Sequence, residues 1–230
     1  MDVSALQQLA GSQFNFARHI LDLNMERAAK TAYIDDQHAI SYGELDRRVR
    51  SFAAGLLAQG VQPEQRVLLV MQDTVDLPVA FLGALFAGVI PVPVNTLLHA
   101  ADYAYMIDHS RARLVIAGAA LLPCVREALG MAKNQPPLIV AGDAPDAGLT
   151  HFSALLACEP LALDAHAATS ADDFAFWLYS SGSTGRPKGA VHSHANLYWT
   201  AQLYGQPVLG VVEDDIHDHG DPVRMCVADE

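Results

Sequence analysis

Val67-Leu-Leu-Val-Met71 is a short, continuous apolar run, and three similar runs follow it along the chain. They are Val89-Ile-Pro-Val-Pro-Val94, Leu114-Val-Ile-Ala117 and Leu138-Ile-Val-Ala141. Apolar residues at helical spacing fill the intervals between them, at roughly 75–87, 100–109 and 121–132. Continuous apolar strands that alternate with helices are typical of βαβ units, in which helices bury both faces of the sheet. The sequence therefore predicts an α/β fold with a mostly parallel sheet.

The segment before these runs predicts a hairpin and a long helix. The stretches Thr31–Asp35 and His38–Ser41 flank the turn residues Asp36-Gln37. Ser41-Tyr-Gly-Glu44 has the spacing of a capping box, and apolar residues then recur at helical spacing as far as Gly60. No clear element is expected before Thr31.

A Ser/Gly-rich loop follows the next predicted strand. Phe174-Ala-Phe-Trp-Leu-Tyr179 has the pattern of a buried strand, and Ser180-Ser-Gly-Ser-Thr-Gly-Arg-Pro-Lys-Gly189 continues directly from it. Residues from Val191 to Tyr204 are expected to form a helix. A strand, a Gly/Ser/Thr loop and a helix in this order allow backbone N–H groups to converge on an anion.

The composition of this loop favours phosphate as that anion. Its glycines permit tight turns, its hydroxyls can donate hydrogen bonds, and Lys188 supplies a positive charge. Neither lysine nor arginine occurs from residue 134 to residue 185, so Arg186 and Lys188 end a long acidic stretch. The ending Pro187-Lys188-Gly189 excludes the Walker A pattern, which requires Gly-Lys-Ser/Thr and is typical of P-loop kinases and NTPases. A flexible, solvated loop is the alternative, but the hydrophobic strand before it and Pro-Lys-Gly after it favour phosphate binding.

Tyr179-Ser-Ser-Gly-Ser-Thr-Gly-Arg-Pro-Lys-Gly189 resembles the AMP-binding signature of adenylate-forming enzymes. The resemblance covers roughly residues 14 to 215 and is greatest to the benzoate–CoA and 4-hydroxybenzoate–CoA ligase branch. The segments that carry it upstream are Thr31-Ala-Tyr-Ile-Asp35, Tyr42-Gly-Glu-Leu45, Pro91-Val-Pro-Val-Asn-Thr-Leu-Leu98 and Asp102-Tyr-Ala-Tyr-Met106. Phe176-Trp-Leu-Tyr179 and His194-Ala-Asn-Leu-Tyr-Trp199 extend it around the loop.

This resemblance implies a two-step reaction that uses ATP, Mg²⁺ and coenzyme A. A carboxylic acid and ATP form an acyl-adenylate and pyrophosphate, and coenzyme A then takes the acyl group as a thioester. The loop would hold the β- and γ-phosphates of ATP, with Thr184 and Lys188 in direct contact and with Arg186 and Pro187 shaping it. The candidate binding residues are Ser180, Ser181, Gly182, Ser183, Thr184, Gly185 and Lys188.

Several motifs of such enzymes have no counterpart in these 230 residues. The resemblance assigns magnesium to a Tyr-Gly-x-Thr-Glu segment, ribose to a Thr-Gly-Asp segment and a catalytic lysine to a C-terminal domain. The only lysines here are Lys30, Lys133 and Lys188, so no catalytic residue is assigned within the chain. We expect an N-terminal fragment that is inactive alone, with a lead-in over residues 1–30 and a partial AMP-binding domain over residues 31–215.

The last fifteen residues, 216–230, are expected to form a tail that departs from the family pattern. They have neither helical nor strand periodicity, and we interpret them as a rearranged or out-of-frame end of a truncated gene. His217-Asp-His219 lies beside several aspartates, but a short tail lacks the fixed geometry that a metal site requires, so no metal site is predicted.

The composition also indicates which binding partners and which cellular compartment to expect. The chain has 14 Lys+Arg against 26 Asp+Glu, a net charge of -12, which argues against a nucleic-acid partner. Cys124, Cys158 and Cys226 are far apart and odd in number, and the N-terminus lacks a basic region, so a reducing cytoplasm is expected. The charge-free run from Leu77 to Ala101 is broken by prolines and glycines, which predicts buried elements and not a membrane span.

Two functions from different classes remain open at this point. One is an ATP-dependent acid–CoA ligase acting on a small carboxylic acid such as benzoate; a medium-chain fatty acid or a cinnamate-like acid is the alternative substrate. The other is a non-catalytic remnant that binds a nucleotide or a partner. Binding of ATP without release of pyrophosphate would favour the remnant. The sequence leaves the particular acid and the oligomeric state undetermined.

Overall fold

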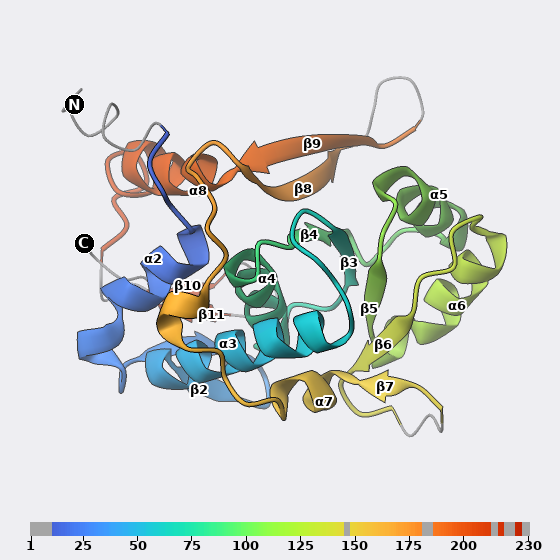
Figure 1. Ribbon diagram of the computed structural model, residues 1–230, viewed down its shortest axis with the longest axis horizontal. Helices are drawn as coiled ribbons and strands as arrows, with labels where there is room; N and C mark the ends of the chain where they lie inside the picture. The colour runs from blue at the N-terminus through green and yellow to red at the C-terminus, as the bar shows by residue number, and fades with distance from the viewer. Residues whose placement is uncertain (1–10, 145–147, 181–185, 213–215, 219–223, 227–230) are drawn as a thin grey trace.

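A five-stranded parallel sheet forms the centre of the protein, with the strand order β4-β3-β5-β6-β7. The computed structural model describes residues 11–144, 148–180, 186–212, 216–218 and 224–226 (Figure 1). The strands are β3 (Arg66–Val70), β4 (Ile90–Pro93), β5 (Leu114–Gly118), β6 (Leu138–Ala141) and the two-residue β7 (Thr150–His151). The predicted α/β fold with a mostly parallel sheet is confirmed, and the four apolar runs form its main strands.

Helices cover both faces of this sheet (Figure 1). The helices α3 (Tyr42–Ala58) and α4 (Asp76–Phe86) lie on one face, and α5 (Ala100–Ser110) and α6 (Leu122–Met131) lie on the other. Val67 and Leu69 of β3 pack with the first pair, whereas Leu68 and Val70 pack with the second. Successive side chains of a strand point to opposite faces, so a continuous apolar strand supplies two separate cores.

The N-terminal part contains the predicted hairpin and one helix that the sequence analysis missed. Strands β1 (Thr31–Ile34) and β2 (Ala39–Ser41) pair antiparallel, and the Ser41 hydroxyl caps α3 by accepting the Glu44 N–H at 3.2 Å. Helix α2 (Phe16–Leu23) and the 3₁₀ turn η1 (Met25–Arg27) precede them, so the expectation of no element before Thr31 was wrong. Asn15, which caps α2, was the available signal.

The C-terminal segment pairs with the N-terminal hairpin. Two three-residue strands, β10 (Ile216–Asp218) and β11 (Arg224–Cys226), extend the hairpin into a sheet with the order β10-β11-β1-β2. The segment thus contains two strands although its sequence has no strand periodicity. Backbone hydrogen bonds hold such short strands, and these bonds require no alternation of apolar and polar residues.

A separate antiparallel hairpin lies beside strand β4 (Figure 1). It consists of β8 (Phe174–Ser180) and β9 (Lys188–Ser193). The N–H of Ile90 donates to the carbonyl oxygen of Gln65, which directly precedes β3. The N–H of Val94, which directly follows β4, donates to the carbonyl oxygen of Leu69 in β3. Pro91 and Pro93 lie between them and have no N–H, so the outer edge of β4 lacks donors and the main sheet ends there.

Shorter elements connect these units. Helix α7 (Phe152–Leu156) packs on α3, and α8 (His194–Thr200) follows β9 and continues into one π-helical turn, η4 (Ala201–Gly205). Two 3₁₀ turns, η2 (Ala119–Leu121) and η3 (Leu163–Ala165), complete the described elements.

Helix α8 is joined to α2 by a buried histidine. The His194 side chain is 1% exposed, and its Nδ1 accepts a hydrogen bond of 3.2 Å from the Phe16 N–H. Burial lowers the pKa of His194 to about 4, and the nearby Asp173 carboxylate opposes this shift. Protonation would place a hydrogen on the accepting nitrogen, so the folded state holds the neutral ring.

We expect stability to fall as the pH is lowered from 7.5 to 5. The folded-state pKa of His194 lies below its unfolded value of about 6.5, so the unfolded chain binds the extra proton first. The loss should be about 2 kcal/mol, measured by urea denaturation at several pH values. His194→Asn, whose amide oxygen can replace Nδ1 as the acceptor, should flatten this dependence; an equally steep profile in the variant would contradict the assignment.

Gly55 permits close contact between α3 and α7. A Cβ at this position would lie 2.7 Å from both the Cα and the Cβ of Leu155 and 2.9 Å from its carbonyl oxygen. Gly55→Ala should therefore lower the free energy of unfolding by about 1–3 kcal/mol. Gly130→Ala in α6 is the matched control, since nothing lies within 4 Å of its added Cβ, and it should stabilise by up to about 1 kcal/mol. Equal melting of the two variants would show that the α3–α7 contact tolerates a side chain.

Candidate functional site

The predicted phosphate loop connects the two strands of the β8–β9 hairpin. In the antiparallel register, Ser180 lies opposite Lys188 and Tyr179 lies opposite Gly189. Both Ser180 and Lys188 are exposed, so a hydroxyl and an ammonium group flank the ends of the loop. The other predicted site residues, Ser181, Gly182, Ser183, Thr184 and Gly185, lie outside the described residues.

The hairpin corrects the predicted setting of this loop. The expected helix from Val191 onward begins only at His194, because Lys188–Ser193 forms β9 and pairs with β8. Gly189 and Ala190, near the start of β9, suit a hairpin as well as the start of a helix. Only the pairing with β8 makes this segment a strand. The order strand–loop–helix was therefore wrong, and no helix begins at the described end of the loop. Anion binding by this loop would rely on Lys188 and on hydroxyl and backbone donors.

A cluster of rings lies between this hairpin and helix α5. The Tyr179 hydroxyl is 2.8 Å from His109 Nδ1, and the His109 ring stacks on Tyr105 with centroids 5.3 Å apart. The Arg186 guanidinium lies 5.7 Å from the centroid of the Tyr105 ring. Burial, and secondarily Tyr105, raises the pKa of Tyr179, so this phenol keeps its proton at neutral pH.

On the other side of strand β8, Phe176 is buried in the main core. Phe176 stacks on His192 with ring centroids 4.6 Å apart, and its edge contacts Phe81 of α4. The Arg66 guanidinium lies 5.7 Å from the Trp177 ring centroid. Phe176 and Trp177 thus anchor the strand from its two sides. Phe174 is 64% exposed, so the prediction of a buried strand was only partly right. Asp173 precedes this strand, and its carboxylate accepts the Ser170 N–H at 2.7 Å.

A cavity that was not predicted from the sequence lies at the carboxyl ends of β3 and β4. It has a volume of about 570 Å³, and its polar lining comes from Gln72, Asp73, Asn95 and Thr96. Ligands of open α/β folds commonly bind at this edge of a sheet. The position of these polar residues directly after two strands was the signal that could have identified them.

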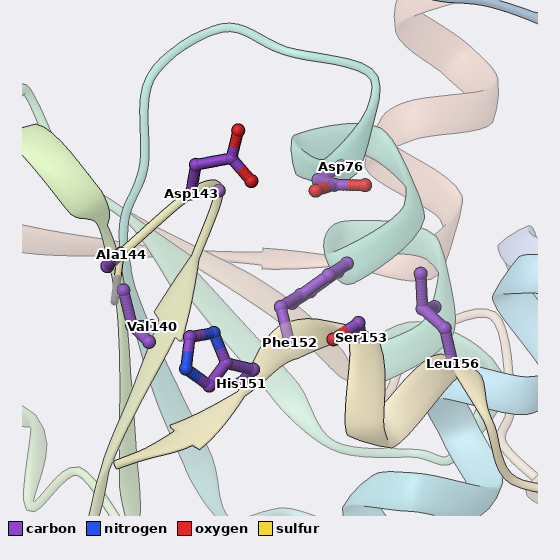
Figure 2. A pocket seen from close by; sticks show the side chains of 9 residues that line it. Asp76, Val140, Asp143, Ala144, His151, Phe152, Ser153 and Leu156 are labelled. Carbon is purple, nitrogen blue, oxygen red and sulfur yellow. The ribbon is translucent and has the colours of Figure 1, made fainter. Parts of the chain in front are cut away.

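A second cavity of about 570 Å³ lies beside β6 and α7. Figure 2 shows Asp76 at the start of α4 and Asp143 after β6 on opposite sides of it, with His151 nearby. Burial raises the pKa of Asp76, while Arg48, 3.6 Å away, opposes the shift. Of the predicted site residues that the structure describes, neither Ser180 nor Lys188 lines this cavity or the first one.

The described part of the chain contains neither a metal-ligand cluster nor a membrane-spanning helix. No group of three or more His, Cys, Asp or Glu residues there is arranged to hold a metal ion. The side chains of His217 and His219 lie outside that part. Among the helices that the structure describes, none combines the length and the apolar character needed to cross a bilayer.

The chain matches one protein family and is similar to several known proteins. Residues 23–228 match the family described as AMP-binding enzyme. The benzoate–CoA ligase of Thauera aromatica is 43% identical over 207 residues, which cover 89% of this chain and 38% of that protein. The 4-hydroxybenzoate–CoA/benzoate–CoA ligase of Rhodopseudomonas palustris is 42% identical over 205 residues, covering 88% and 38%.

Solved structures agree with these relatives. A benzoate CoA ligase from Burkholderia xenovorans LB400 superposes with a TM-score of 0.80 and 55% identity, over 88% of this chain and 39% of that one. The anthranilate CoA ligase AuaEII, solved in complex with anthranoyl-AMP, gives a TM-score of 0.83 and 31% identity over the same shares. The chain thus spans about two fifths of the length of the proteins that it resembles. Its sequence, its fold and the match over residues 23–228 together place it in the AMP-binding enzyme family.

Proposed function

We propose that this chain provides the phosphate-binding part of an ATP-dependent ligase that joins an aromatic carboxylic acid to coenzyme A. The observation that carries the proposal is the pairing of Ser180 with Lys188 at the ends of the signature loop. This pairing brings a lysine and a hydroxyl together at the exposed end of the hairpin, in a protein of strongly negative net charge. A polyphosphate is an anion that suits such a donor set.

The class of acid follows from the relatives. Those described above are named for benzoate, 4-hydroxybenzoate and anthranilate, all of which are aromatic carboxylates. We infer that benzoate or a close analogue is the substrate. The enzyme would work in the cytoplasm, since Cys124 and Cys158 are free thiols, as a reducing compartment favours.

The proposed chemistry has two steps. A carboxylate oxygen attacks the α-phosphorus of ATP, the bond to the β-phosphate oxygen breaks, and pyrophosphate leaves as the acyl-adenylate forms. The thiol of coenzyme A then attacks the acyl carbon, the thioester forms, and AMP leaves. Lys188 and the hydroxyls from Ser180 to Thr184 would hold the β- and γ-phosphates and balance the charge that develops on pyrophosphate. Mg²⁺ would neutralise part of the same charge, and the resemblance assigns its carboxylate to a segment without a counterpart here.

Lys188→Ala should weaken binding of MgATP to the chain by about tenfold, since a charged contact to phosphate is lost. The thermal unfolding midpoint should stay unchanged, because the Lys188 side chain is exposed. Binding can be followed by titrating the ¹⁵N-labelled chain with MgATP. Lys133→Ala, at another exposed lysine, is the matched control and should bind as the unaltered chain does. Equal affinity in the two lysine variants would remove Lys188 from the site.

The 230-residue chain by itself should form no benzoyl-CoA from benzoate, MgATP and coenzyme A. Adenylation requires the acid, the α-phosphorus, the metal and a charge-stabilising lysine in one geometry, and the chain supplies the phosphate loop alone. Phosphate binding without those groups stabilises the substrate and leaves the barrier in place. Chromatography of the reaction mixture provides the test. Thioester above a no-enzyme control, lost in Lys188→Ala, would show that these residues suffice for catalysis.

A further inference from the structure

Helix α5 presents two rings toward the β8–β9 hairpin. Tyr105 and His109 are four residues apart, so they lie on the same face of the helix, and their rings stack at an interplanar angle of 23°. Tyr103, Met106 and Ile107 are buried and hold the helix against the main sheet. The packing of these neighbours therefore fixes the helix that carries the stacked pair, while the His109 side chain is exposed.

This pair contacts the chain just before the phosphate loop. The His109 Nδ1 lies 2.8 Å from the Tyr179 hydroxyl, and the two rings meet edge to face with centroids 5.7 Å apart. Because the phenol keeps its proton, its O–H can donate to this nitrogen. Tyr179 is followed directly by Ser180, the first of the candidate binding residues.

The same pair also contacts the chain just after the loop. The Arg186 guanidinium lies 5.7 Å from the centroid of the Tyr105 ring, within the distance of a cation–π interaction. Arg186 precedes Lys188 by two residues. One stacked pair on one helix thus touches both sides of the loop, through a hydrogen bond on one side and a cation–π contact on the other.

We propose that Tyr105 and His109 are positioning residues that hold the two sides of the phosphate loop, so that Ser180 and Lys188 remain together facing one phosphate group. This inference rests on the proposed function. The rings act through Tyr179 and Arg186 and are given no contact with ATP. A loop whose ends are held before binding loses less conformational entropy when the ligand arrives, and this raises affinity without adding a contact.

A purely structural role for these rings predicts a different result. If they only stabilised α5 or the hairpin, removing them would lower the unfolding midpoint and leave the affinity of the folded chain unchanged. If they position the loop, affinity should fall while the midpoint is kept. The affinity of folded protein and the order of the loop ends therefore separate the two roles.

The test compares Tyr105→Leu, Tyr105→Phe and Tyr179→Phe in the ¹⁵N-labelled chain. Tyr105→Leu removes the ring that faces Arg186 and His109, Tyr105→Phe keeps it, and Tyr179→Phe removes only the hydroxyl. Tyr204→Leu is the control, since Tyr204 is 53% exposed and lies in η4, away from α5 in sequence. Each variant is titrated with MgATP, and the ¹H–¹⁵N NOE of the Arg186, Lys188 and Gly189 amides is measured without ligand, to report their fast backbone motion.

We expect Tyr105→Leu and Tyr179→Phe to bind MgATP about threefold to tenfold more weakly, the size of one lost exposed contact. Their NOE values at the three amides should fall, with unfolding midpoints unchanged. Tyr105→Phe and Tyr204→Leu should match the unaltered chain. Unchanged affinity and NOE in Tyr105→Leu and Tyr179→Phe would overturn the inference, even where Lys188→Ala abolishes binding and the proposed function stands.

Failure of the proposed function gives a different pattern. If the NMR signals of the unaltered chain do not shift when MgATP is added, the proposal that this chain binds phosphate is wrong. The NOE comparison alone then tests whether Tyr105 and His109 hold the ends of the loop. Lower values in Tyr105→Leu with normal values in Tyr105→Phe would support it. Equal values in both would overturn it.

Discussion

The parallel sheet must be covered on both faces, and most of the structure follows from this requirement. Strands β3, β5 and β6 are apolar on each side, so α3 and α4 bury one face while α5 and α6 bury the other. Burial of an apolar face contributes roughly 25 cal/mol per Å², which makes the two helical layers the dominant source of stability. Helix α5 belongs to the second layer and lies beside the β8–β9 hairpin. Its side chains Tyr105 and His109 therefore contact the residues that flank the phosphate loop.

The main sheet ends at strand β4 for a local reason. Pro91 and Pro93 leave the outer edge of β4 without donors at alternate positions, so the next strands form their own hairpin beside it. Side chains, and not a backbone ladder, connect the hairpin to the rest of the protein: Phe176 contacts Phe81 on one side, and Tyr179 contacts His109 on the other. Such contacts fix Phe176 and Tyr179 in the strand that leads into the loop.

Charge placement supports a site at this loop in a protein that is otherwise acidic. The chain carries a net charge of -12, yet Arg186 and Lys188 lie two residues apart after fifty-two positions without a cation, residues 134–185. Arg186 is turned onto the Tyr105 ring, whereas Lys188 is exposed opposite Ser180. Both side chains are exposed, but only Arg186 contacts the Tyr105 ring, so the proposed phosphate contact is assigned to Lys188.

The sequence by itself determined strands β3 to β6 of the main sheet, the helices between them and the capped start of α3, because periodicity and the Ser41 cap act over a few residues. The two-residue β7 carries no such pattern and was not predicted. The loop motif also identified the family. Tertiary contacts decided the rest. The stretch Lys188–Ser193 becomes a strand because β8 is available to pair with it, and β10 and β11 form because β1 offers an edge. Tyr105, His109 and Tyr179 meet only in the folded chain, since residues seventy positions apart carry no local signal of contact.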